Sequence, residues 1–451
     1  MEKRGNFSNK IGFVLAAAGS AVGLGNIWRF PYLAAKYGGG TFLLVYLILA
    51  VTFGFSLMVA EIAIGRKTGL SAIQAFKKLD KRFGGVGYLA AIIPIIIFPY
   101  YSVIGGWVIK YLVTFTTHNG VAAADDSYFT GFVSGTTEPL IYFLIFIVFT
   151  AVVVWFGVEK GIEKVSKFMM PVLVVLTIFI AVYGLTIDGA MDGLSYYLKP
   201  RLEDFSFKTV VSAMGQLFYS MSLAMGIMIT YGSYMKKENN LESSVRQIEI
   251  FDTAIAFFAG LMIIPAVFAF SGGDKAALGK GPSLMFVTLP KVFDSMPFGQ
   301  VIAAVFFILV LFAALTSAIS LMETIVSIFC DKFGWSRHKA CLIVFICSAA
   351  IGVLPCLGFG VLGFISAGGM TILDIMDFVS NSILMPICAL LTCILVGFIV
   401  KPKIIIDEVT RNGEKFKSRK LFVITIKWIS PICLVIILIT SVLDALGIFQ
   451  I

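Results

Sequence analysis

Residues 19–31 read GSAVGLGNIWRFP and lie inside an apolar run that extends from Ile11 to about Ala35. The run is long enough to cross a bilayer as a helix, yet its centre carries three glycines, an asparagine and Arg29. A glycine costs a helix interior about 1 kcal/mol relative to alanine, and an arginine at the centre of a span costs roughly 3 kcal/mol on insertion scales. We therefore predict a helix that is broken near residues 21–25.

A break at this depth exposes backbone groups that suit small ions. Free carbonyls and N–H groups are tolerated inside a membrane only where they line a cavity. The carbonyls suit a small cation, and the N-terminus of the second half-helix suits a carboxylate. The alternative reading is a helix-packing face, because Gly19 and Gly23 lie four residues apart.

The composition is that of a polytopic membrane protein. Of the 451 residues, 59% are hydrophobic and 14% are charged, and the mean hydropathy is +0.97. The cysteines form no CxxC pair and the two histidines lie far apart, so the sequence predicts neither disulfides nor a His/Cys metal centre. We expect no cleavable signal peptide, because the first apolar run is too long and contains the motif. The chain is interpreted as one transporter-type domain, residues 1–451, without a separate soluble part.

We predict an all-α protein with eleven membrane spans. Loops that would be cytoplasmic with the N-terminus inside hold 25 Lys and Arg residues, and the opposite loops hold 7. By the positive-inside rule this bias predicts a cytoplasmic N-terminus and an external C-terminus. The net charge of +9 is then explained by the topology and does not indicate a nucleic-acid-binding surface. Residues 401–420 are expected to be a solvated linker beside anionic lipid. The predicted spans are roughly 11–35, 41–65, 87–113, 139–157, 165–187, 209–234, 251–271, 298–330, 340–356, 374–400 and 421–446.

The sixth span contains a second predicted break, at GQLFYSMSLAMG (residues 215–226). Interrupted segments in corresponding positions of two halves indicate a transporter site between inverted repeats. Because spans 1 and 6 are five apart, we predict a 5+5 inverted repeat, with repeat one at about 11–187, repeat two at about 209–400 and an extra helix at about 421–446. Serines that bond to their own helix are the alternative explanation of the sixth span.

Several other polar residues lie at membrane depth, which makes them functional candidates. The eighth span contains Thr316 and Ser317, whose hydroxyls are also explained as helix-packing groups. Oxygen ligands without His or Cys suit an alkali cation better than a transition metal. The acidic candidates are Glu61, Asp252, Glu323, Asp374 and Asp377.

The sequence SAVGLGNIWRFPY at 20–32, followed by GGGTF at 38–42, resembles the signature of the neurotransmitter:sodium symporters. The sixth span, AALTS at 313–317 and LDIMDF at 373–378 are also similar to that family, so the resemblance covers essentially the whole chain. Eleven spans are the pattern of its bacterial members. The resemblance implies a plasma-membrane symporter, not an enzyme, that imports an amino acid with sodium by alternating access.

The resemblance also implies two sodium sites, which are the only cofactor sites expected. The first would use the carbonyl of Ala21, the side chain of Asn26, Ser220 and Asp252. The second would use the carbonyls of Gly19, Val22 and Ala313 with the hydroxyls of Thr316 and Ser317.

The implied substrate site binds a carboxylate on the N–H groups of Leu24 and Gly25, beside Tyr101. Because Gly23 supplies no fixed acid, the substrate must bring its own carboxylate, which favours an α-amino acid over a monoamine. Met225 is flexible and leaves room for a large apolar side chain, aromatic ones included. The other implied contacts are Ala21, Tyr219, Ser220 and Ser222 around the amine and sodium, and Ile97, Ser317 and Leu321 around the side chain.

Two gates follow from the same resemblance. Arg29 and Asp377 would form the outer gate, with Tyr101 and Tyr219 as its lid. The inner gate would consist of Arg4 and Asp331, near Phe7 and Tyr234. Tyr219 stands where the family usually has Phe, and Phe7 stands where it usually has Trp.

We expect transport to be independent of chloride. Chloride-dependent relatives hold the anion partly with an Asn and a Ser four residues later, and this chain has Asp252 and Ala256 there; Tyr46, Gln216 and Ser220 still match the remaining ligands. The alternative reading of Asp252 is an acid at a helix N-terminus, favoured by the helix dipole.

We also expect the fifth span to unwind at its cytoplasmic end and hydrate the second sodium. Gly161 and Pro171 match a Gly-x9-Pro pattern of the family, and Pro171 frees a carbonyl one turn earlier. A proline kink that serves packing alone is the alternative.

Other functions remain open at this point. Proton coupling through Glu61 or Asp252 is one, and a sensor that binds an amino acid without transporting it is another. A channel would need a continuous polar pore, and an intramembrane enzyme would need a nucleophile with a base or a metal; neither pattern is present. The predicted partners are the amino acid, sodium and the lipid bilayer, with no nucleic acid, and no pattern specifies an oligomeric state.

Overall fold

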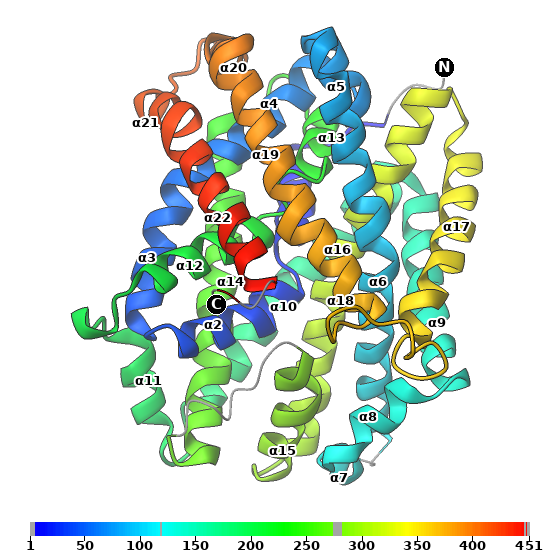
Figure 1. Cartoon of the computed structure of the whole chain (residues 1–451), viewed down its shortest axis with the longest axis vertical. Coiled ribbons are helices and arrows are strands. Elements are labelled where there is room, and N and C mark those ends of the chain that lie inside the picture. The colour runs from blue at the N-terminus through cyan, green and yellow to red at the C-terminus, as the bar shows by residue number, and fades with distance from the viewer. Residues whose placement is uncertain (1–4, 118–119, 274–281, 446–447, 449–451) are drawn as a thin grey trace.

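The computed structural model describes residues 5–117, 120–273, 282–445 and 448 and is a bundle of helices (Figure 1). Within these residues the backbone forms no strand beyond one isolated bridge between Ala367 and Met370. The all-α prediction is therefore confirmed.

Nine helices in the described part of the chain are long and apolar enough to cross a membrane, and a bent pair at the N-terminus makes a tenth. Each overlaps a predicted span, although the fifth and the seventh begin seven and ten residues earlier than predicted, at Val158 and Leu241. The sixth predicted span is occupied by α12 (Phe207–Ser220) and α13 (Ile227–Tyr234), each too short to cross a bilayer alone, so the count of eleven stays a prediction. The nine helices are Gly40–Thr68, Lys81–Thr116, Thr137–Trp155, Val158–Gly184, Leu241–Ser271, Gly299–Phe333, Arg337–Leu357, Ile372–Ile399 and Arg419–Asp444.

Several of these spans consist of two α-helices joined by a wider π-helical turn. The labelled helices are α3 (Gly40–Leu49), α4 (Phe55–Thr68), α6 (Gly84–Thr116), α9 (Thr137–Trp155), α10 (Lys164–Gly184), α14 (Leu241–Ser271), α16 (Gly299–Phe333), α17 (Arg337–Leu357), α18 (Ile372–Asp377), α19 (Met385–Ile394), α21 (Arg419–Ile424) and α22 (Ser430–Ala445).

The first predicted break is present. α1 (Lys10–Ala21) ends where the glycine-rich stretch begins, and the chain resumes as a π-helical turn, Gly25–Arg29, that continues into α2 (Phe30–Lys36). The two halves are bent by 54°. α1 packs against α10, α13, α14 and α16, so the break lies in the centre of the bundle.

The second break separates α12 from α13 and is held by a carboxylate from another span. Ser222 and Ala224 have φ values of 53° and 62°, a left-handed conformation that costs non-glycine residues on the order of 1–3 kcal/mol. Glu61 Oε1 accepts a hydrogen bond of 2.7 Å from the Ala224 N–H. We infer that Glu61, on α4, stabilises the open backbone of the sixth span.

Short helices lie within the predicted loops, where the sequence indicated none because a helix of one to three turns carries little periodic signal. They are α5 (Ala72–Leu79), α7 (Gly120–Ala123), α8 (Asp126–Ser134), α11 (Ala190–Leu198), α15 (Leu289–Asp294) and α20 (Lys403–Val409).

The prediction that residues 401–420 form a solvated linker is wrong for α20. Arg66 Nε lies 2.8 Å from Glu408 Oε1, with side chains 0% and 3% exposed, and Arg66 also donates to the Asn239 carbonyl. This buried ion pair joins residues 342 positions apart, which no local pattern reveals. It fixes α20 against α4 at the end of the bundle that we call the basic end (loops 66–86, 158–168, 235–250, 331–340 and 401–420), at the top of Figure 1.

Candidate binding site at the two broken helices

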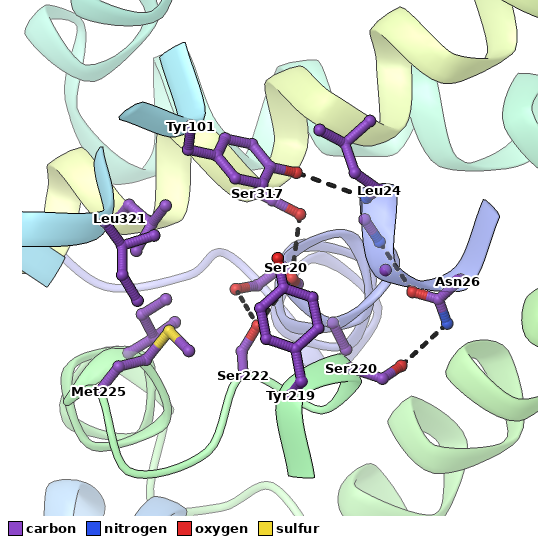
Figure 2. Close-up of a pocket in the computed structure, with 15 residues that line it drawn as sticks. Ser20, Leu24, Asn26, Tyr101, Tyr219, Ser220, Ser222, Met225, Ser317 and Leu321 are labelled. Carbon is purple, nitrogen blue, oxygen red and sulfur yellow. Dashed lines mark hydrogen bonds between the residues drawn. The ribbon is translucent and has the colours of Figure 1, made fainter. Parts of the chain in front are cut away.

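A cavity lies where the two breaks meet (Figure 2). The structure brings every residue of the predicted substrate site to this one cavity, although their role as substrate contacts stays a prediction. It adds three residues that the sequence analysis did not place there, Ser20, Asn26 and Ile227. The lining residues are Ser20, Ala21, Gly23, Leu24, Gly25, Asn26, Ile97, Tyr101, Tyr219, Ser220, Ser222, Met225, Ile227, Ser317 and Leu321.

The second half of the first span presents its N-terminus to this cavity. The Leu24 N–H points at the Tyr101 hydroxyl, 3.5 Å away (Figure 2). A Cβ on Gly23 would lie 2.8 Å from Ser317 Oγ, and one on Gly25 would lie 2.7 Å from the Tyr219 ring. The glycines therefore let neighbouring side chains approach the half-helix closely, and they leave its N–H groups accessible to an anion.

Oxygen atoms converge on Asn26 in an arrangement that fits a small cation. The Asn26 amide nitrogen donates to Ser220 Oγ at 3.0 Å, to the Asp252 carbonyl at 3.2 Å and to Asp252 Oδ1 at 2.8 Å. Asn26 and Asp252 are fully buried. The three oxygens, one of them from the Asp252 carboxylate, surround the position of the Asn26 amide nitrogen, and oxygens of this kind suit a hard cation such as sodium.

The position of Asp252 contradicts the reading of this residue as a helix N-terminal acid. α14 begins at Leu241, so Asp252 lies in its interior, several turns from the end. Ser220 Oγ donates to Asp252 Oδ1 at 2.7 Å, and the Tyr46 hydroxyl lies 3.4 Å from Oδ2. The carboxylate therefore faces the broken helices and not the loop.

The residues of the predicted second cation site also meet. Ser317 Oγ lies 3.4 Å from the Gly19 carbonyl and 3.3 Å from the Val22 carbonyl. Thr316 Oγ1 lies 3.1 Å from the Ala313 carbonyl, and a Cβ on Gly19 would touch the Thr316 side chain at 3.1 Å. Carbonyl and hydroxyl oxygens of this kind are ligands for an alkali cation.

The two residues of the predicted outer gate, Arg29 and Asp377, interact electrostatically but form no direct ion pair among the described side chains, and their role as a gate stays a prediction. The Arg29 guanidinium instead lies over the Tyr219 ring, 5.1 Å from its centre. Asp377 accepts hydrogen bonds from the Tyr100 hydroxyl at 3.0 Å and from Asn381 at 2.6 Å. Tyr219 thus has Arg29 above it and the cavity below it.

Asp374 has a local role that the sequence analysis did not assign. Its side chain forms a capping box with Thr371 at the start of α18, which explains this acid without a ligand.

The inner gate is described in part, because Arg4 lies outside the described residues. Asp331 Oδ2 accepts a hydrogen bond of 2.7 Å from the Ser71 N–H. Phe7 is fully buried, packs edge-on against Tyr231 and Tyr234, and donates its N–H to the Tyr234 carbonyl. The N-terminal segment therefore closes the basic end against α13.

Two buried acids next to this segment carry contacts that the sequence did not reveal. Glu163 accepts a hydrogen bond of 2.7 Å from the Ser8 N–H and pairs with Lys167 at 2.5 Å. The sequence analysis assigned Glu163 to a loop between spans and missed it. Glu323, which was named without a role, accepts hydrogen bonds from the Tyr234 hydroxyl at 2.7 Å and from Arg337 at 3.0 Å.

The fifth span is helical throughout in this conformation. A π-helical turn, Val158–Glu163, leads directly into α10, which includes Pro171. The predicted unwinding between Gly161 and Pro171 is therefore not present in the structure as it stands.

The sequence and the structure are similar to those of known transporters. A model of the sodium:neurotransmitter symporter family matches residues 4–138 and 130–448. An uncharacterized sodium-dependent transporter of Bacillus subtilis (strain 168), YhdH, is 35% identical over 97% of both chains. The human sodium- and chloride-dependent GABA transporter 2 is 26% identical over 84% of this chain and 70% of its own length. The crystal structure of MhsT in complex with L-phenylalanine has a TM-score of 0.87 and 36% identity, covering 97% of this chain and 100% of that one.

Proposed function

The chain belongs to the sodium:neurotransmitter symporter family, and we propose from this premise that it imports an amino acid with a large apolar or aromatic side chain, driven by sodium. The observation that carries the proposal is the cavity at which both broken helices meet, with oxygen atoms clustered on two sides of it. The positive-inside bias of the loops supports a plasma-membrane orientation with the N-terminus in the cytoplasm and the C-terminus outside.

In this proposal the amino acid bridges the two breaks. Its carboxylate binds the N–H groups of Leu24 and Gly25 and the Tyr101 hydroxyl, where the half-helix dipole favours negative charge. Its amine meets the carbonyls at the ends of α1 and α12. The side chain then faces Met225 and Leu321, and the amino acid bound to the similar MhsT, L-phenylalanine, has a side chain of this class.

Two sodium ions fit the donor sets on either side of the substrate. Asn26, Ser220 and Asp252 would hold one, after the Asn26 amide turns its oxygen toward the ion. The carbonyls of Gly19, Val22 and Ala313 with the hydroxyls of Thr316 and Ser317 would hold the other. The second ion would tie α1 to α16 and so keep the basic end closed. Each sodium that enters also gains about 2.3 kcal/mol per 100 mV of membrane potential.

We further propose that transport does not require chloride. The positive charge of the first sodium needs a compensating negative charge in a low-dielectric site. Asp252 would supply this negative charge from a fully buried position. One turn later on the same helix, Ala256 lacks the hydroxyl of the Ser that the resemblance implies for chloride-dependent relatives. In this respect the chain would differ from its relatives with chloride in their names.

Uptake into proteoliposomes tests the proposed function. We expect saturable uptake of a radiolabelled apolar amino acid that requires an inward sodium gradient, after a binding screen of the twenty amino acids has selected the substrate. Uptake that a pH gradient drives in the absence of sodium would show that transport is coupled to protons and not to sodium. Glu61 and Asp252 are the candidate proton-binding residues. Sodium-dependent binding without uptake would indicate a sensor.

We predict that decarboxylated analogues do not compete with the substrate. Phenethylamine lacks the carboxylate that would bind Leu24, Gly25 and the first sodium, and Gly23 has no side chain to replace it. A lost charge-assisted interaction is worth about 1.5–3 kcal/mol, so we expect at least a tenfold weaker inhibition than by L-phenylalanine. Competition assays with both compounds measure this, and equal inhibition would contradict an α-amino-acid site.

We predict that Pro171→Ala slows transport but spares substrate binding. Alanine restores the missing N–H donor in α10, and a more regular helix resists the opening that would hydrate and release the second sodium. Single-turnover uptake and equilibrium binding should be compared in the same preparation. An equal loss of both would indicate that Pro171 serves packing.

A further inference from the structure

A groove on the outside of the bundle lies apart from the central cavity. It runs between α9 and α17, which lie side by side at the edge of the bundle (Figure 1), and it has a volume of about 400 Å³. Its walls are apolar and come from both helices. Those used in the argument are Val148, Val152 and Trp155 on α9, Phe156 directly after it, and Leu342 and Phe345 on α17.

The groove faces the lipid. Val152 is 50% exposed, Phe156 is 63% exposed and Leu342 is 51% exposed, and all three belong to or adjoin helices apolar enough to span a membrane. The residues from Val148 to Phe156 cover about 12 Å at 1.5 Å per residue. Half of the hydrocarbon core is about 15 Å thick, so the groove extends from headgroup level through most of one leaflet.

The mouth of the groove lies at the basic end. α9 ends at Trp155 and α17 begins at Arg337. The rings of Trp155 and His338 are 4.5 Å apart, and Lys339 Nζ lies 5.1 Å over the Trp335 ring. Amphipathic rings of this kind favour the level of the lipid headgroups.

The mouth carries an excess of positive charge. Arg337 turns inward, where it pairs with Glu323 and donates to the Val154 carbonyl. In the adjoining loops 158–168 and 331–340 the exposed basic side chains are Lys160, Lys164, His338 and Lys339, against one exposed acid, Glu159. Basic pockets between membrane helices on the cytoplasmic side bind anionic headgroups.

We propose that this groove binds one phospholipid with an anionic headgroup from the leaflet at the basic end. One acyl chain lies in the apolar groove, and the phosphate lies beside His338 and Lys339. The apolar hollow with basic side chains at one end matches an acyl chain with an anionic headgroup. Because a ligand that binds only the folded state stabilises it, the lipid should raise the melting temperature.

The test uses the full-length chain, purified in detergent and stripped of lipid. Its Tm is measured with added palmitoyl-oleoyl phosphatidylglycerol (POPG) or with the zwitterionic palmitoyl-oleoyl phosphatidylcholine (POPC). We expect POPG to raise the Tm more than POPC. The double variant His338→Gln/Lys339→Gln should lose most of this difference, and Val152→Trp, which fills the groove, should lose it as well.

Matched controls separate the groove from general effects of charge and bulk. Lys403→Gln removes an exposed cation elsewhere at the basic end, and Val182→Trp adds the same bulk at a position of α10 that is 59% exposed. Both should keep the wild-type difference between POPG and POPC.

Each other outcome overturns the proposal. Equal Tm shifts with POPG and POPC in the wild type would show that the site does not prefer an anionic headgroup. A POPG preference that both groove variants keep would show that the lipid binds elsewhere. A dimer of the wild type that Val152→Trp disrupts would show that a second copy covers the groove. If the variants do not fold, native mass spectrometry of the wild type decides: one POPG retained per chain in the presence of excess POPC supports the site, and none overturns it.

Discussion

The variant Thr316→Ala/Ser317→Ala should lose sodium-dependent substrate binding and sodium-driven uptake. These residues supply the two hydroxyls that lie next to the carbonyls of Gly19, Val22 and Ala313. An interaction of a hydroxyl with a charged group contributes about 1.5–3 kcal/mol, so the loss of both should weaken sodium binding by roughly a hundredfold or more. Sodium titrations of substrate binding in detergent measure this change directly.

A second double variant serves as the control for the loss of two buried hydroxyls. Thr150→Ala/Thr177→Ala removes threonines that are equally buried and that bond to carbonyls of their own helices, α9 and α10. It should keep the sodium affinity of the wild type. An unchanged sodium affinity in the Thr316/Ser317 variant would show that the second cation site does not lie at α16.

Local patterns in the sequence predicted the centre of the molecule well. A simple membrane anchor would not contain glycines at 19, 23 and 25 together with Arg29. The break in the first span could therefore be inferred from the free-energy cost of these residues in a continuous membrane helix. The structure shows why two of these positions exclude a side chain, since Ser317 approaches Gly23 and Tyr219 approaches Gly25. A signal of this kind is local and needs no knowledge of the fold.

Long-range contacts were beyond the reach of the same reasoning. The Arg66–Glu408 ion pair and the hydrogen bond from Ser8 to Glu163 join segments that are distant in the sequence. From the sequence alone, each of these four residues is predicted to lie in a solvated loop or terminal segment. The outer gate shows the same limit. Asp377 accepts a hydrogen bond from Asn381 four residues later in the same span, but its second partner, Tyr100, is 277 residues away and depends on how α6 and the tenth span pack.

The wild-type protein should transport equally well in chloride and in gluconate, whereas Asp252→Asn should lose most of its uptake in gluconate. The carboxylate lies in the same buried cluster as Asn26 and Ser220. Removing a charge about 4 Å from a bound sodium costs about 4 kcal/mol at an effective dielectric constant of 20, which is roughly a thousandfold in sodium affinity. Uptake into proteoliposomes with each anion outside measures the effect.

The matched variant Asp252→Asn/Ala256→Ser shows whether charge compensation is the reason. It introduces the Asn and the Ser that, as the resemblance implies, bind chloride in dependent relatives; Tyr46, Gln216 and Ser220 already match the other ligands that the resemblance implies. We expect chloride to rescue its uptake much more than it rescues Asp252→Asn. Glu249→Gln, which removes a buried acid from the same helix, should not create a chloride requirement. If wild-type uptake collapses in gluconate, Asp252 does not provide the compensating charge, and a bound anion must do so.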